Sequence, residues 1–226
     1  MALPRENPSL LSGLPQHLSA SLFGNTTPVR LKTDEVLFLS GDAGDGCYRV
    51  EDGLLKVTMV SRAGTERILA FLGSGAIVGE LSLIDGLPRS ASVVAVRPAQ
   101  LSFLSRAAFE DFANKHPEVY RSLLTLIAAR LRETDATVAA GSFLPLRGRV
   151  ACTLLELAQE FGQDVGSGRI VIRHKIAHND LAAMVGTARE NVTRVLADWK
   201  RTNLVTRLSG YYCLENRAKL EEQGEL

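Results

Sequence analysis

The hydrophobic pattern of the chain changes once, near its middle. Between Val29 and Leu104 it consists of short β-type runs, such as VRLKTDEVLFLSGD and SASVVAV, separated by Gly, Asp and Pro. Many short strands with turn residues between them are typical of an antiparallel barrel or roll. Glycine recurs here and can supply the positive backbone angles that tight turns need. The first half of the chain is therefore predicted to be an antiparallel β-roll without a long helix.

After Phe109 the apolar positions follow a helical period instead. The stripe advances in steps of four and three residues, which is the a/d spacing of a coiled-coil seam. Its members are Tyr120, Leu124, Ile127, Leu131, Thr134 and Val138. Such a helix either pairs with a second copy of the chain or lies as an ordinary amphipathic helix on the β-roll. The spacing alone leaves both interpretations open.

Gly141 and Pro145 are expected to end this helix and to mark a domain boundary. Beyond them, the pattern predicts a helix from Arg149 to Phe161, a short strand, two helices in HNDLAAMVG and TARENVTRVLADWKRTNL, and two strands around Ser209-Gly210. The expected fold class is α+β. It comprises a β-roll over residues 1–108, a long helix over 109–141, and a helix-turn-helix with a β-wing over 142–226.

The two helices near the end of the chain have the proportions of a helix-turn-helix. Asn179 or Asp180 is expected to cap the first helix, Gly186 permits the turn, and Thr187 is expected to cap the second helix. One face of the second helix is predicted to be buried and carries Val192, Val195, Leu196 and Trp199. Its opposite face is then free to meet a partner.

That opposite face carries the groups that a DNA-reading helix uses. They are Arg189, Glu190, Thr193 and Arg194. Arginine can donate two hydrogen bonds to guanine, and glutamate can accept one from cytosine, near the N-terminal end of such a helix. Further candidates for DNA contacts at the helix ends and in the wing are Thr187, Lys200 and Arg207. The alternative is that Glu190 and Arg194 simply pair on a solvated surface.

Charge is distributed unevenly along the chain. The net charge is only +1, but residues 168–219 carry 10 Lys and Arg against 4 Asp and Glu, which makes that segment +6. A local basic excess suits a polyanion such as nucleic acid. The chain has no basic start followed by an apolar run and no apolar stretch near the roughly 18 residues of a membrane helix, so we expect a cytoplasmic protein without membrane contact.

Cysteine and histidine give little indication of metal or redox chemistry. Cys47, Cys152 and Cys213 are odd in number and far apart, which argues against a disulfide framework and a closely spaced metal motif. We expect buried or idle thiols and no metal site. A metal-dependent phosphodiesterase is disfavoured because the four histidines show no paired spacing.

The stretch Gly79 to Ala91, GELSLIDGLPRSA, combines features of an anion site. Arg89 has the charge and fork geometry for a phosphate, and the hydroxyl of Ser90 can complete the cradle. Glu80 is a pure acceptor at neutral pH, so it suits a ribose hydroxyl. The alternative is an internal ion pair between Glu80 and Arg89 beside a hairpin.

The same residues carry a resemblance to a known family. From about residue 29 to 216 the chain resembles the cyclic-AMP receptor protein and fumarate-nitrate regulator superfamily of bacterial transcription factors. The residues that match its phosphate-binding cassette are Gly79, Glu80, Leu81, Arg89, Ser90 and Ala91. SGDAGDGCYRVEDGLLKV is similar to the family's glycine motif, and GTARENVTRVL to its recognition helix. The resemblance implies that the glutamate binds the ribose 2′-hydroxyl and that the arginine and serine bind the cyclic phosphate of cyclic AMP.

The resemblance also gives the long helix a role. It implies a homodimer in which a threonine, here Thr134, contacts the purine and is followed by a serine from the partner subunit. This chain has Asp135 instead, whose carboxylate could accept from the N1–H and N2 amino group of guanine, so cyclic GMP is an alternative ligand. Arg130, one turn earlier, is placed to approach the pocket.

The resemblance thus predicts a regulator that performs no chemistry, needs no covalent cofactor, binds palindromic double-stranded DNA as a homodimer and contacts RNA polymerase. Iron–sulfur sensing would need N-terminal cysteines, which the first 46 residues lack, and His17 and His116 stand alone as haem ligands. Two alternatives stay open. One is a regulator of this fold with a different effector or none, and the other is a regulatory subunit that does not bind DNA.

Overall fold

The computed structural model describes residues 20–24 and 26–225 and divides the chain into two compact units. The first ends at Arg132 and the second begins at Glu133, inside the long helix α4 (Glu118–Phe143). Each unit is described by itself. His17 and most of the N-terminal segment lie outside the described residues. No described helix combines the length and apolarity needed to cross a membrane.

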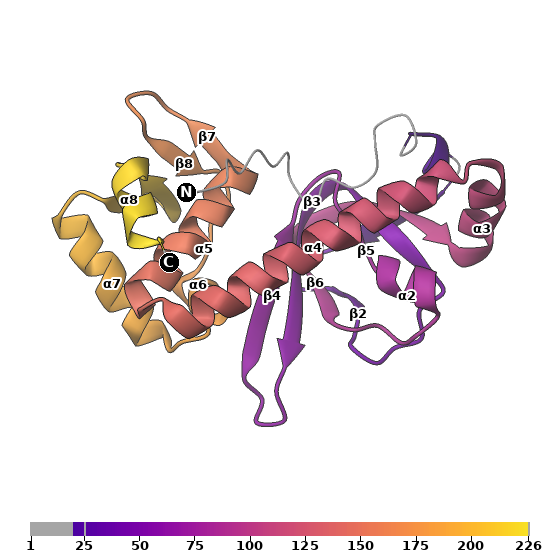
Figure 1. Ribbon diagram of the computed structural model, residues 1–226, viewed down its shortest axis with the longest axis horizontal. Helices are drawn as coiled ribbons and strands as arrows, with labels where there is room; N and C mark the ends of the chain where they lie inside the picture. Colours follow the sequence, from indigo (N-terminus) through magenta and orange to yellow (C-terminus); the bar gives the residue numbers. More distant parts are fainter. Residues whose placement is uncertain (1–19, 25, 226) are drawn as a thin grey trace. The chain divides into compact units, whose positions relative to one another are not determined.

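The first unit is built on an antiparallel sheet of six strands (Figure 1). Its strand order is β1-β6-β3-β4, while β2 pairs with β6 and β5 pairs with β3. The bounds are β1 (Thr27–Leu31), β2 (Val36–Phe38), β3 (Gly46–Val60), β4 (Glu66–Leu72), β5 (Ile77–Val78) and β6 (Ser92–Ser105). The predicted antiparallel roll is therefore confirmed, although β3 and β6, with 15 and 14 residues, are longer than the short strands that were expected.

Strands β3 and β6 form the frame of this sheet and pair along most of their length. Their register shifts between Asp52 and Leu55, where Gly53 has φ +117°. A Cβ at Gly53 would lie 2.5 Å from the Cβ of Ala99 on the facing strand. Only glycine fits a positive φ and so close an approach, so this position lets the long strand bend and the sheet roll up.

Two hydrophobic clusters stabilise the first unit. One lies inside the roll and includes Val50, Leu55 and Val93, whose side chains are fully buried. The other joins the roll to its helices, since Phe109 of α3 (Arg106–Lys115) and Val119 of α4 pack in one cluster with residues from β3, β6 and α2. The start of α4 is thereby fixed to the β-roll.

Helix α4 carries the predicted apolar stripe on its surface. Four of its members are exposed in the single chain, namely Tyr120, Leu124, Leu131 and Val138. The single helix expected over 109–141 is instead two helices, because α3 ends at Lys115 and α4 begins at Glu118, directly after Pro117. Helix α4 ends two residues later than expected, because Gly141 lies inside its last turn and the amide of Leu144 still donates to the carbonyl of Ala140. A glycine weakens a helix by about 1 kcal/mol relative to alanine, which does not suffice to end it.

The second unit has the expected winged helix-turn-helix fold (Figure 1). Its four-stranded sheet has the order β7-β8-β10-β9. The bounds are α5 (Leu146–Phe161), β7 (Gly162–Asp164), β8 (Ile170–Ile172), α6 (His178–Val185), α7 (Arg189–Arg201), β9 (Val205–Leu208), β10 (Tyr211–Leu214) and α8 (Arg217–Gln223). Trp199 of α7 and Tyr212 of β10 are among its largest fully buried side chains. The fold class predicted from the sequence is confirmed.

The two predicted helix caps are wrong in detail. Helix α6 begins after Ala177 and α7 after Ala188, and neither start has a side-chain cap. The hydroxyl of Thr187 instead accepts a hydrogen bond from the side-chain amide of Asn191, with 3.1 Å between Nδ2 and Oγ1. Gly186 does form the turn, with φ +73°.

Candidate functional site

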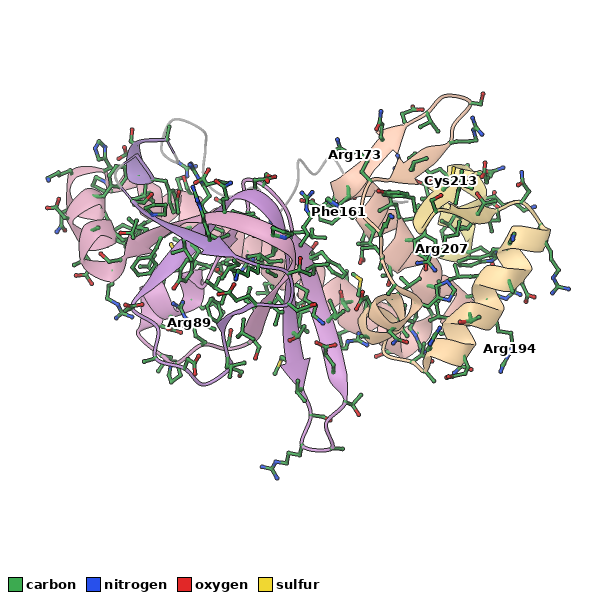
Figure 2. The ribbon with its side chains drawn as sticks, turned by 180° about the vertical axis from the view of Figure 1, so that it is seen from behind. Arg89, Phe161, Arg173, Arg194, Arg207 and Cys213 are labelled. Carbon is green, nitrogen blue, oxygen red and sulfur yellow. The ribbon has the colours of Figure 1, made fainter. Side chains whose placement is uncertain are left out.

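Arg89 lies buried in the β-roll, just before β6, and only 4% of its surface is exposed (Figure 2). Its Nη1 donates to the carbonyl oxygens of Gly46 at 2.8 Å and Gly79 at 2.9 Å. The guanidinium carbon also lies 4.4 Å from the centroid of the Phe38 ring. These contacts fix the position of the cation, since cation–π pairs and charge-assisted hydrogen bonds are strong when desolvated.

The charge of Arg89 is poorly compensated. The nearest carboxylate oxygen belongs to Asp45, 4.0 Å away on a side chain that is 84% exposed. The buried Nε atom of Arg89 has no hydrogen-bond partner. A buried, incompletely paired cation is costly, so this geometry favours binding of an anion.

Glu80 is the second buried charge of the site, with 1% of its surface exposed. It begins the short helix α2 (Glu80–Asp85), and its Oε1 accepts a hydrogen bond from Nη1 of Arg130 on α4. Arg130 also donates to the carbonyl of Ile77 at 2.9 Å. Oε2 of Glu80 has no partner. Glu80 is thus paired with Arg130 rather than with Arg89, which removes the internal hairpin pair as the explanation of this segment.

The backbone at Gly44 and Gly79 approaches the side chain of Arg89 closely. Gly79 has φ +82°, and a Cβ there would lie 2.3 Å from Nη1 of Arg89. A Cβ on Gly44 would lie 2.3 Å from the Cβ of Ser82 and 3.3 Å from the guanidinium carbon of Arg89. The segments around residues 44 and 79 therefore enclose the arginine so tightly that both positions need glycine.

The structure distributes the other predicted ligand residues over two places. Ala91 is buried, whereas Ser90 and Leu81 are exposed. Thr134 and Asp135 are exposed on α4, about one turn beyond Arg130, and belong to the second unit. Four residues along a helix return to the same face, so Arg130 and Thr134 share one side of α4.

Sequence reasoning missed the aromatic neighbours of Arg89. Phe38 and Tyr48 both face the guanidinium of Arg89, and their rings lie 6.1 Å apart. Burial raises the pKa of Tyr48, with a smaller opposing effect of Arg89. Burial also raises the pKa of the Cys47 thiol to about 12, with the Glu80 charge as a second cause, so this cysteine is protonated and inert at neutral pH.

The candidate recognition surface of the second unit is the exposed face of α7. Its inner face is buried as predicted, while Arg189, Glu190, Thr193 and Arg194 are exposed. Figure 2 shows Arg194 on this helix. The ion pairs of the described second unit involve neither Glu190 nor Arg194. Both side chains are therefore available to a partner.

The basic residues at the end of α7 differ in availability. Arg201 and Arg147 both bind Asp198, and these contacts, led by the hydrogen bond from Arg201, lower the pKa of that carboxyl. Lys200 is exposed and takes part in none of the ion pairs found among the described residues. Lys200 therefore remains free for an external phosphate.

A second feature that the sequence did not indicate joins α6, α7 and the wing. Nδ1 of His178 lies 3.1 Å from the hydroxyl of Thr193. Arg207 donates to the carbonyl of Ile176 at 2.9 Å, and its guanidinium lies 5.0 Å from the centroid of Tyr212. The ring centroid of His178 lies 6.3 Å from that same aromatic ring. The exposed Arg207 thus belongs to a basic cluster with His178 rather than projecting freely from the wing.

This cluster predicts a pH dependence of stability. Burial, and then the charges of Arg207 and Arg189, lower the pKa of His178 below its usual 6.5. Because the unfolded chain binds the proton more readily, stability falls as the pH drops below about 6.5 toward the folded pKa. Denaturation followed by the fluorescence of Trp199, the chain's single tryptophan, measures this effect in the second unit. His178→Gln is expected to reduce the slope of the free energy of unfolding against pH, by an amount that corresponds to less than one bound proton.

His116→Gln is the matched control, because His116 lies in the first unit and contacts Glu118. It should leave the pH slope of the Trp199 transition unchanged. An identical slope in wild type and His178→Gln would contradict the assignment.

The two units together define a class of protein. A β-roll with a buried arginine and glutamate, joined through a long helix to a winged helix-turn-helix, is the architecture of a ligand-sensing transcription regulator. Within the described residues, no three His, Cys, Asp or Glu side chains form a group suited to a metal ion.

Comparisons with known proteins identify the family. Residues 28–116 match the family "Cyclic nucleotide-binding domain", and residues 148–223 match the "Crp-like helix-turn-helix domain". The "Cyclic AMP receptor protein" of Thermus thermophilus is 38% identical over 82% of each chain. The "CRP-like cAMP-activated global transcriptional regulator" of Mycobacterium tuberculosis is 31% identical over 89% of each chain. The chain therefore belongs to the CRP/FNR family of transcription regulators.

A solved structure supports the fold independently of close sequence similarity. FixK2 from Bradyrhizobium japonicum is 20% identical, with a TM-score of 0.79 over 89% of this chain and 98% of that one. Because the matched families and relatives are transcription regulators, the expectation that the chain is not an enzyme is confirmed.

Proposed function

We propose that a cyclic nucleotide binds at Arg89 and controls DNA binding by this regulator. The cyclic phosphate would contact Arg89 and Ser90, and the ribose hydroxyl would contact Glu80, with Gly79, Leu81 and Ala91 completing the cassette. The observation that carries the proposal is the pair of buried charges with unpartnered atoms, Nε of Arg89 and Oε2 of Glu80. Arg89 can donate hydrogen bonds to the cyclic phosphate, and Oε2 of Glu80 can accept one from the ribose hydroxyl.

Arg130 links the proposed pocket to α4. It occupies Oε1 of Glu80, whereas Oε2 has no partner, so a ribose hydroxyl could donate to Oε2 without displacing the arginine. The nucleotide and α4 would then share one carboxylate. Through this contact, occupancy of the pocket would bias the position of the helix, provided the ligand binds one arrangement better than another.

The proposed output is a homodimer on palindromic DNA. The exposed stripe of α4 supplies an apolar seam for a second copy, in agreement with its a/d spacing. Two recognition helices must lie about 34 Å apart to meet successive major grooves on one face of DNA. In this proposal residues 1–108 sense the ligand, 109–141 dimerise and 142–226 bind DNA. The regulator would act in the cytoplasm and contact RNA polymerase.

The proposed DNA contacts fall into two groups. The residues proposed to read bases are Arg189, Glu190, Thr193 and Arg194. The residues proposed to contact the DNA backbone are Thr187, Lys200 and Arg207. The exposure of these α7 side chains, and the absence of ion pairs at Glu190 and Arg194 in the described second unit, support their availability to DNA.

Isothermal titration with cyclic AMP and, separately, cyclic GMP tests the ligand directly. We expect saturable binding of at least one of them to the purified protein, because both share the ribose and cyclic phosphate. If the folded protein gives no heat with either nucleotide, the cassette serves another effector or none.

Asp135 is proposed to set the choice between the two nucleotides. Asp135→Ser would remove an acceptor for guanine N1–H and N2, and a hydrogen bond to a charged group is worth about 1.5–3 kcal/mol. We therefore expect the ratio of cyclic AMP affinity to cyclic GMP affinity to rise about tenfold or more in the variant. Asp111→Ser, at an exposed acid of α3, is the control and should leave the ratio unchanged. An unchanged ratio in Asp135→Ser would separate Asp135 from base choice.

A further inference from the structure

Arg106 connects the two segments that enclose Arg89. It is the first residue of α3 and follows directly after β6. Its Nη2 donates to the carbonyl of Ser82 in α2 and lies 3.4 Å from the carbonyl of Gly44. Its backbone amide donates to the carbonyl of Asp45 at 2.7 Å. Arg106 thus holds helix α2 and the loop of residues 44–46 together.

Gly86 leaves little space on one side of this guanidinium. A Cβ on Gly86, which has φ +73°, would lie 2.8 Å from Nη1 of Arg106. The amide of Gly86 donates to the same Ser82 carbonyl at 3.1 Å. Ser82 itself is buried against the 44–46 loop, where a Cβ on Gly44 would clash with it. Both carbonyls are reached by the one atom Nη2 while Gly86 lies close to Nη1, so the contacts depend on the planar guanidinium holding these two nitrogens at fixed positions.

The charge of Arg106 has no carboxylate partner among the ion pairs of the described residues. Its recorded partners are carbonyl oxygens. Arginine therefore acts here as a multiple hydrogen-bond donor, and the positions of its acceptors depend on its geometry.

Those acceptors belong to the segments that also orient Arg89. Gly46, two residues after Gly44, accepts from Nη1 of Arg89, and the amide of Arg89 donates to the carbonyl of Asp42 at 2.8 Å. Gly79, which immediately precedes α2, accepts from the same Nη1 atom. A change in spacing between the 44–46 loop and α2 would therefore move the carbonyls that hold Arg89.

We propose that Arg106 is a positioning residue of the anion site, which sets the spacing between the 44–46 loop and α2 and thereby the placement of Arg89. Its effect on ligand affinity rests on the proposed binding of a cyclic phosphate at Arg89. Arg106 acts through the backbone and does not contact the ligand.

Hydrogen exchange of the ligand-free full chain tests the positioning itself. In Arg106→Ala, the amides of Gly86 and Arg89 are expected to exchange at least tenfold faster, because the Gly86 amide donates to Ser82 in α2 and the Arg89 amide donates to Asp42, just before the 44–46 loop. Arg106→Lys keeps the charge but not the fork and should give an intermediate rate. Arg97→Ala is the matched control, since Arg97 donates to the Gly53 carbonyl, away from the pocket. Unchanged exchange in Arg106→Ala would overturn the proposal, whether or not a nucleotide binds.

Titration with cyclic AMP and cyclic GMP then measures the consequence for the site. Arg106→Ala is expected to weaken every nucleotide that the wild type binds at least tenfold, and by one common factor where both bind, because the shared phosphate end is displaced. The transition of Trp199 in the second unit should not move. Faster exchange with unchanged affinity would reduce Arg106 to a structural clamp and overturn its role at the site. If the wild type binds neither nucleotide, the ligand proposal fails, and the exchange result alone decides the positioning.

Discussion

Replacement of Arg89 by alanine is expected to weaken cyclic nucleotide binding by at least about a hundredfold. A charge-assisted hydrogen bond contributes about 1.5–3 kcal/mol, and the guanidinium can offer two or more to a cyclic phosphate. Two such bonds correspond to a loss of roughly 10²- to 10⁴-fold in affinity. Titration calorimetry well below the unfolding temperature measures the loss directly.

The fold of the Arg89→Ala variant is expected to survive. The substitution leaves the carbonyls of Gly46 and Gly79 without this donor, which costs about 1–3 kcal/mol for each buried group. It also removes a buried cation whose nearest carboxylate lies 4.0 Å away, which offsets part of that cost. Circular dichroism and thermal unfolding check this expectation independently of binding.

Two variants separate the role of Arg89 in binding from its role in structure. Arg89→Lys keeps the charge and loses the fork, so it should bind more weakly than wild type and more tightly than Arg89→Ala. Arg97→Ala removes an arginine with one carbonyl contact elsewhere in the roll and should bind normally. Wild-type affinity in folded Arg89→Ala would show that the ligand, if any, binds elsewhere.

Local sequence patterns predicted the elements of the fold well. Short β-type runs separated by glycine predicted the antiparallel roll. Apolar residues spaced by three and four positions predicted helix α4 and the buried face of α7. These features depend on neighbours along the chain, so they can be read without tertiary information. The short helix α2 was not predicted, because six residues between Gly79 and Gly86 hold too few turns for a period to emerge.

The contacts within the site could not be predicted, because they join distant residues. Glu80 and Arg130 are fifty positions apart, and Arg106 is twenty-four positions from Ser82. The cassette residues predicted an anion and ribose site at Arg89 and Glu80, but not which cation would pair with Glu80. The helix caps failed for a local reason, since a polar residue near a helix start can also lie in the first turn or before the cap position.

The proposed DNA interface assigns different roles to two positive charges on one helix, Arg189 and Lys200. Arg189 lies at the start of α7, where a recognition helix meets base edges, whereas Lys200 lies at its other end and has the geometry of a point charge. A base contact contributes to one sequence and a phosphate contact to all sequences. The two residues should therefore separate in an experiment that compares specific with random DNA.

Arg189→Ala is expected to cost about 1–3 kcal/mol on a palindromic operator, or roughly 5- to 150-fold in affinity, and to relax one base position in each half-site. Lys200→Ala should weaken operator and random DNA by the same factor and reduce the slope of log affinity against log salt by about one. Band-shift titrations at several salt concentrations, with an operator selected from random DNA by the liganded wild type, measure both effects. Lys219→Ala, an exposed lysine of α8, is the control and should change neither. Equal losses on operator and random DNA for Arg189→Ala would assign Arg189 to the backbone and leave base reading to the other exposed residues of α7.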